Sequence, residues 1–305
     1  MGDGHGGQGT PGADLHPGTG EKGAVWVARR IPDDCVSGHA NQARIHTFPQ
    51  QGKRLVKAPS VPSFAGSDVK QKTFAYYSVG DSCLFSTDVI TFARRHGLVA
   101  NNVKDQNFDF SKAYGEKDYL AFRGCDGRVW AWYNRVASGM ERYFPFVDKQ
   151  GRPTATGYVG DDGQPIEVLP LYVRPDRRLT HRDVQAAMAD HFEGTPWDMT
   201  HDLGAGPFEC PYRWRPMIWR ATQAAADTVE YLHERAIATQ QTAFTFVAEM
   251  RGWLPREIGA KTWFGVDDAA TALYLPIYNN ITHSPAPCVQ ATATFSPSPR
   301  VRSSG

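Results

Sequence analysis

Short apolar runs separated by polar, glycine- and proline-containing stretches dominate this chain. The run Ala24–Ala28 (AVWVA) predicts a short, largely buried strand. A second strand is expected from about Val36 to Ile45, after the turn-forming residues at 32–34. Residues 49–80 are polar and contain several Gly, Pro, Ser and Lys, which predicts a loop.

Helical spacing of apolar residues appears in three stretches of the chain, 86–97, 128–143 and 181–193. The third is the clearest, because Thr180 and Asp183 resemble a capping box and a glycine follows the last periodic residue. The middle of the chain is therefore predicted to be helical.

Strand-like runs return in the last third of the chain, at Ala236–Val247, Lys261–Val266 and Ala272–Tyr278. The short polar link between the last two runs predicts an antiparallel hairpin. Residues 148–168 predict a further hairpin or an exposed loop. The order of strands, then helices, then strands favours an α+β fold over a doubly wound one.

The two ends of the chain have little to bury. Residues 1–22 are rich in Gly, Pro, Thr and Asp, and residues 289–305 are rich in Ser, Pro and Arg. Such compositions do not offset the entropy of ordering, so both ends are expected to be disordered tails. The ordered portion is expected to span residues 23–288.

Composition excludes several classes of function. The formal net charge of the 305 residues is +1, and no basic cluster typical of a nucleic-acid-binding face is visible. The chain has no apolar run of the ~20 residues that a membrane span needs, and its start lacks the apolar segment of a signal peptide. The five cysteines are scattered, without metal-site or disulfide-framework spacing, which favours a cytoplasmic location.

Acidic and histidine residues gather between positions 190 and 202. His191 falls on the apolar face of the predicted 181–193 helix, and Pro196 separates it from His201. No recognised metal-ligand spacing occurs, so a hydrogen-bonded structural corner is favoured over a metal site. The cluster consists of Asp190, His191, Glu193, Asp198, His201 and Asp202.

Two short motifs carry groups that could act on a substrate. In SGHANQ, the amide of Asn41 can donate to a developing oxyanion and His39 is a candidate base, although an asparagine there also fits a turn. In PYRWRP, Arg213 or Arg215 can bind a carboxylate bidentately, or can stack on the tryptophan between them. Cys35 follows two aspartates that raise a thiol pKa, which argues against it as a nucleophile.

Several stretches, in the expected order from Gly23 to Cys288, resemble the dipeptidase-A/secernin family of N-terminal-nucleophile hydrolases. They include GAVWVARRIPDDCVSGHANQARI, RVWAWYN, HFEGTPWDMT, GAGPFECPYRWRP and TWFGVDDAATALYLPIY. The resemblance implies an αββα sandwich with antiparallel sheets and cleavage of dipeptides through an acyl-enzyme. It implies a cysteine nucleophile at the first residue of the mature chain and no metal or organic cofactor. In the wider class an asparagine and an arginine lie near the nucleophile; Asn41 and Arg213 or Arg215 are similar in kind.

The chain departs from this family at its start, which reads Met-Gly-Asp-Gly, and its first cysteine is Cys35. We therefore expect an incomplete sandwich that lacks the nucleophile and the first strands. A dipeptidase acting on dipeptides is the leading hypothesis, with the chain a fragment that is inactive alone. The alternative is a secernin-like, non-catalytic binding or regulatory protein, or an inactive remnant. Self-association into a homo-oligomer stays open.

Overall fold

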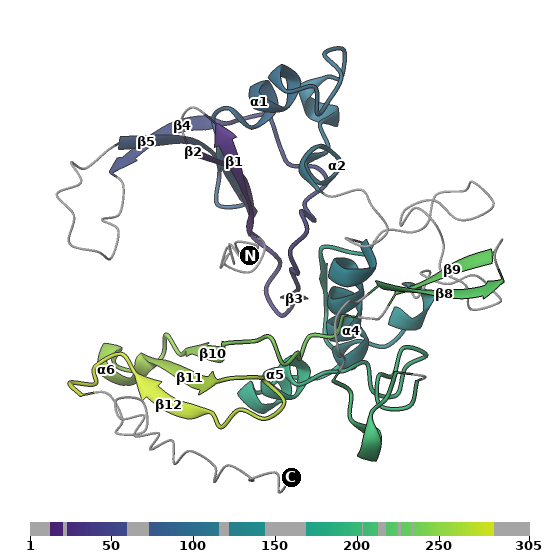
Figure 1. Ribbon diagram of the computed structural model, residues 1–305. Helices are drawn as coiled ribbons and strands as arrows, with labels where there is room; N and C mark the ends of the chain where they lie inside the picture. The colour runs from purple at the N-terminus through teal and green to yellow at the C-terminus, as the bar shows by residue number, and fades with distance from the viewer. Residues whose placement is uncertain are drawn as a thin grey trace, which may run out of the picture. The chain divides into compact units, whose positions relative to one another are not determined.

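A computed structural model divides the chain into two compact units, Met1–Gln240 and Gln241–Gly305, which are described separately. Figure 1 labels most of the elements of both units. The described residues are 13–20, 23–59, 73–115, 122–143, 169–202, 204–212, 218–224, 227–232 and 235–283.

The first unit begins with an antiparallel sheet in the strand order β1-β2-β6-β5-β4. Its strands are β1 (Ala13–Gly20), β2 (Gly23–Arg29), β4 (Arg54–Pro59), β5 (Thr73–Val79) and β6 (Cys83–Ser86).

The inner face of this sheet forms one hydrophobic core. Val25 and Val27 on β2 are fully buried, and Phe85 on β6 lies 4.9 Å, centroid to centroid, from Phe48. The helices α1 and α2 add their apolar residues to the same core. They span Val89–Arg95 and Phe110–Tyr114, with a 3-10 turn at Asp105–Asn107 between them.

A second core surrounds helix α4 (Gly127–Val136), which continues from a π-helical turn at Phe122–Asp126. Trp130 and Tyr133 are almost fully buried, and Phe192 packs against this core from the segment after helix α5 (His181–Met188). In the described part of this core no large sheet is present, and α4 provides the framework for the surrounding loops.

Smaller elements complete the first unit. The two-residue strands β3 (Val36–Ser37) and β7 (Tyr172–Val173) pair antiparallel. Strands β8 (Ile218–Ala224) and β9 (Asp227–Leu232) form an antiparallel hairpin. Short 3-10 helices occupy Met140–Tyr143 and Pro207–Glu209.

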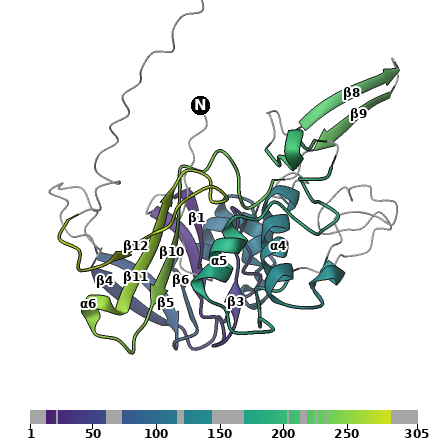
Figure 2. The ribbon, with the colours of Figure 1, turned by 90° about the horizontal axis from the view of Figure 1, so that it is seen from below.

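The second unit is an antiparallel sheet in the order β10-β11-β12, which Figure 2 shows side by side. These strands span Phe244–Met250, Ala260–Val266 and Leu275–Tyr278, and the short helix α6 (Arg256–Gly259) precedes β11. Pairing of β11 with β12 confirms the hairpin that the sequence predicts at this point.

The structure confirms the mixed α+β class, the buried strand at 24–28 and all three helical stretches. Helix α1 starts after Asp88 and ends before Gly97, whose φ of +68° is accessible to glycine at little cost. The capping box of Thr180 and Asp183 is formed at the start of α5.

Four predictions about secondary structure differ from the structure. The strand predicted at Ala236–Val247 begins only at Phe244, as β10, because residues 240–241 form a turn. The segment predicted as a loop at 49–80 contains β4 and β5, which pair with each other and, through β5, with β6. Their sequences, RLVKAP and TFAYYSV, contain apolar and aromatic residues typical of strands, but the Gly, Pro, Ser and Lys residues of the same segment favour a loop for all of it. The strand predicted at 36–45 stops at Ser37. The helix predicted at 181–193 ends at Met188, so His191 lies beyond it.

At the N-terminal end, β1 pairs with β2 within the range assigned to a tail, because a sheet edge supplies hydrogen bonds that do not depend on apolar side chains. Residues 1–12, 144–168 and 284–305 lie outside the described residues. So do the predicted C-terminal tail and the predicted loop at 148–168. Among the helices that the structure describes, none is long and apolar enough to cross a membrane.

We expect Thr180→Ala to destabilise α5 by about 1 kcal/mol, because the capping side chain no longer satisfies the first backbone N–H groups of the helix. Amide hydrogen exchange of residues 183–188 measures this directly. The control is Arg182→Ala, an exposed position on the same helix. Equal exchange rates in the two variants would contradict the capping role.

Candidate functional site

The segment that follows β3 is held against helix α4 by close backbone packing. A Cβ atom on Gly38 would lie 3.0 Å from Val129 Cγ1 and 3.1 Å from Trp132 Cδ1, so only glycine fits without a shift. Ser37 Oγ donates a hydrogen bond to the carbonyl of Leu171 at 2.8 Å. These contacts fix the start of the SGHANQ motif.

A buried arginine, Arg44, fixes the other end of this segment. Its Nη1 donates to the carbonyl of Gly38 at 2.7 Å, and its Nη2 donates to the carbonyl of Pro170 at 2.9 Å. Its Nε lies 3.5 Å from a carboxylate oxygen of Asp126, and both side chains are almost fully buried. The guanidinium thus joins three segments that are distant in sequence.

Tyr133 on α4 completes this network. Its hydroxyl donates to the carbonyl of Leu171 at 2.7 Å and accepts from the backbone N–H of Gly38 at 3.3 Å and from Arg44 Nη1 at 3.2 Å. The hydroxyl is therefore both donor and acceptor inside the core, where an unpaired polar group is costly.

Asn41 ends the segment in a left-handed backbone conformation, with φ of +59°. Asparagine tolerates this region better than most residues, which explains why the predicted strand stops before it. The Nη2 of Arg128 donates to Asn41 Oδ1 at 2.8 Å, and the Nε of Arg128 donates to the carbonyl of Gly124 at 2.7 Å. Because a guanidinium only donates, this bond fixes which end of the Asn41 amide is the oxygen and leaves the NH₂ group as its donor.

A second cation, Arg235, and one thiol, that of Cys125, interact with Arg128. Cys83 belongs instead to the core of the sheet. Burial lowers the pKa of Arg128, and the neighbouring charge of Arg235 lowers it further. Burial raises the pKa of the Cys125 thiol, and the nearby Arg128 guanidinium offsets this only in part. Burial raises the pKa of Cys83 to about 11. Neither thiol is therefore a ready nucleophile at neutral pH.

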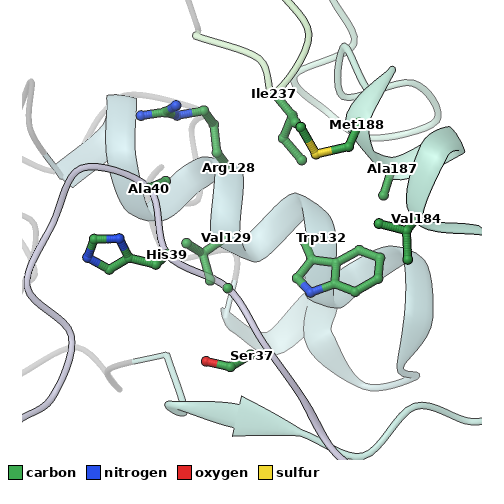
Figure 3. A pocket seen from close by; sticks show the side chains of 11 residues that line it. Ser37, His39, Ala40, Arg128, Val129, Trp132, Val184, Ala187, Met188 and Ile237 are labelled. Atoms are coloured by element: carbon green, nitrogen blue, oxygen red, sulfur yellow. The ribbon is translucent and has the colours of Figure 1, made fainter. Parts of the chain in front are cut away.

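A cavity of about 360 Å³ lies between the segment after β3 and the helices α4 and α5. Figure 3 shows its wall side chains at close range. The wall is largely apolar, and its polar side chains are Ser37, His39 and Arg128. Asn41 adjoins the cavity through its neighbour Ala40 and its hydrogen bond to Arg128.

The acidic and histidine cluster forms the structural corner that the sequence predicts. Arg135 pairs with the buried Asp190 and, at 3.0 Å, with Glu193. His191 Nδ1 lies 3.1 Å from a carboxylate oxygen of Glu193. Asp198 accepts hydrogen bonds from backbone N–H groups of the same turn. Among the described residues, no group of His, Cys, Asp and Glu side chains is arranged to hold a metal ion.

The prediction that His191 lies on the apolar face of a helix is wrong. The residue lies in the turn after α5, because the chain leaves helical geometry at Ala189. His191 is nevertheless buried, against the ring of Tyr212 at a centroid distance of 5.7 Å.

The predicted site residues are thus only partly brought together. Asn41 and His39 lie beside the cavity, while Arg213 and Arg215 lie outside the described residues, and their roles stay predictions. Sequence reasoning did not single out Arg44 or Arg128. Both lie in stretches quoted for the family resemblance, but a lone arginine in such a stretch gives no sign of the atoms it contacts.

Comparison with known proteins agrees with this resemblance. The family model for peptidase family C69 matches residues 18–300, and the chain therefore belongs to peptidase family C69. It is 23% identical over 264 residues to Dipeptidase A of Lactobacillus helveticus, covering 86% of this chain and 40% of that protein. It is 22% identical over 266 residues to a probable dipeptidase of Salmonella dublin, covering 86% of this chain and 43% of that protein. The chain thus spans less than half the length of the relatives it matches.

We expect Tyr133→Phe to lower the free energy of unfolding of the first unit by about 1–3 kcal/mol, because it leaves buried polar groups without their partner. Denaturant unfolding followed by tryptophan fluorescence measures the loss. Tyr172→Phe, at an exposed position on β7, is the matched control. A loss no larger than that of the control would refute the role assigned to the hydroxyl.

The ion pairs of Glu193 predict a pH dependence of stability. Burial alone would raise its pKa, but hydrogen bonds from His191 lower it from 4.5 to about 2. The folded pKa lies below the unfolded one, so the stabilisation is present above about pH 4.5 and is lost as pH falls toward 2. The stability difference between wild type and Glu193→Gln should therefore shrink over this range.

Unfolding measured at pH 7, 5 and 3 tests this dependence. Glu141→Gln, at an exposed position, serves as the control. A difference between wild type and Glu193→Gln that stays constant from pH 7 to 3 would show that the carboxylate does not stabilise the corner.

Proposed function

We propose that this protein serves in the hydrolysis of dipeptides by a cysteine-type mechanism of the N-terminal-nucleophile class. Membership of peptidase family C69 supports peptide hydrolysis, and the names of both relatives support dipeptides as substrates. Within this chain, the proposal rests on the Asn41 amide. Its orientation is fixed by a hydrogen bond from Arg128, which lines the cavity.

The proposed reaction needs a thiolate, a proton acceptor and an oxyanion donor. A cysteine at the start of a mature chain supplies its own base, since a free α-amino group has a pKa of about 7.7–8.0. The thiolate attacks the peptide carbonyl, the amine of the second residue leaves with a proton, and a thioester remains. Water then attacks the thioester and releases the first amino acid and the thiol.

Asn41 is the proposed donor to the negatively charged oxygen of the tetrahedral intermediates. A fixed amide stabilises this charge because it need not reorient during the reaction. The bond from Arg128 Nη2 to Asn41 Oδ1 keeps the amide in one orientation and polarises it, which strengthens its NH₂ group as a donor.

The attacking thiolate is not assigned to Cys83 or Cys125, since burial raises the pKa of both thiols. The expectation that it stands at the first residue of a mature chain stays a prediction. The alternative is a secernin-like, non-catalytic binding or regulatory protein of this family, or an inactive remnant.

Hydrolysis assays with a panel of dipeptides test the proposal. In a preparation that releases free amino acids, we expect Asn41→Ala to lower kcat by about 100- to 1,000-fold, because one oxyanion donor is lost. Cys83→Ala and Cys125→Ala should leave kcat unchanged. Thiol alkylation should abolish the activity, and a chelator should not.

Asn101→Ala, at an exposed turn, is the control for Asn41→Ala. An unchanged kcat in Asn41→Ala would overturn the role of Asn41, and loss of activity in Cys125→Ala would overturn the exclusion of that thiol. Binding of dipeptides without any hydrolysis by the 305-residue protein would favour the non-catalytic alternative.

A further inference from the structure

The cavity beside Asn41 has two chemically different ends. Figure 3 shows His39 and the guanidinium of Arg128 at one side, with Ala40 between them, and most of the apolar side chains at the other. Its volume of about 360 Å³ is at the lower end of small-molecule sites, roughly 300–1,000 Å³. The apolar wall consists of Val129, Trp132, Val184, Ala187, Met188 and Ile237.

The polar end carries positive charge. Arg128 is fixed by its two hydrogen bonds, to Asn41 Oδ1 and to the carbonyl of Gly124. The charge of Arg235 disfavours the protonated form of Arg128, which places a second cation close by. Because two neighbouring cations repel each other, an anion bound at this end is favourable.

The nearby carboxylate of Asp126 favours the charged form of Arg128 and is shared with a second arginine. It lies within the buried network of Arg44, 3.5 Å from the Nε of that guanidinium. This carboxylate therefore interacts with two guanidinium groups, those of Arg44 and Arg128, while Arg235 adds a third positive charge near Arg128. A carboxylate from a ligand can thus add to the charge compensation at Arg128.

We propose that this cavity binds the C-terminal residue of a dipeptide, with its carboxylate at Arg128 and an apolar side chain against Trp132 and Met188. The inference rests on the proposed function and specifies its substrates as dipeptides that end in an apolar residue. In a dipeptide only the peptide nitrogen and one Cα separate the scissile carbonyl from the terminal carboxylate. The hydrogen bond between Arg128 and Asn41 keeps the two side chains close to each other, so that in this proposal the carboxylate binds at Arg128 while the scissile carbonyl lies near Asn41.

The proposed contact between the dipeptide carboxylate and Arg128 is tested by calorimetry, which measures the binding of Gly-Leu and of Gly-Leu amide to the 305-residue protein. We expect the amide to bind about 10- to 100-fold more weakly, since it lacks the charge that complements Arg128. In Arg128→Gln the acid and the amide should bind alike. Arg182→Gln, an exposed position on α5, should keep the full difference.

The proposed contact of the apolar side chain with Trp132 and Met188 is tested by comparing the binding of Gly-Leu with that of Gly-Gly. We expect Gly-Leu to bind about tenfold or more tightly, because each buried methylene group favours binding. Trp132→Ala should reduce this preference, whereas Trp253→Ala, at an exposed position of the second unit, should not. Binding of 4-methylpentanoate as tightly as Gly-Leu would show a site for apolar carboxylates in general and would overturn the dipeptide assignment.

These measurements do not depend on catalysis, so the two proposals can fail separately. Hydrolysis without discrimination between Gly-Leu and its amide would overturn this inference and leave the proposed function standing. Discrimination that depends on Arg128, without hydrolysis, would support the inference and count against the catalytic proposal. An absence of any dipeptide binding would overturn the inference. Circular dichroism of each variant confirms that the comparison is made between folded proteins.

Discussion

The buried guanidinium of Arg44 is the constraint on which the first unit depends. A charged group inside a protein is stable only when its donors are paired with good geometry. Here the carbonyls of Gly38 and Pro170, the hydroxyl of Tyr133 and the carboxylate of Asp126 provide those partners. Because these groups come from separate segments, pairing Arg44 also fixes how the segments meet.

The candidate site follows from this arrangement. The segment after β3 is anchored by Arg44 and packs on α4 through Gly38, so Asn41 reaches Arg128. The same packing leaves the cavity between this segment and the helices α4 and α5. Substrate recognition and oxyanion stabilisation are thus proposed for neighbouring side chains that one buried network positions.

Local sequence patterns predicted well where local interactions decide the structure. The capping box of Thr180 and Asp183, the helix ending before Gly97 and the hairpin of β11 with β12 all formed as expected. Strands β4 and β5 were not predicted, although β5 (TFAYYSV) has the aromatic residues typical of strands, because the Gly, Pro, Ser and Lys residues around them favoured a loop for the whole segment.

The sequence by itself determined the α+β class, the main helices, the family resemblance and Asn41 as a candidate donor. Only the tertiary structure decided that Arg128 orients Asn41, that Arg44 is a buried anchor and that a two-ended cavity lies beside them. The physical reason is that helix caps and turns depend on residues a few positions apart. An arginine's partners, by contrast, are set by segments that meet only when the chain folds, here up to 126 positions apart.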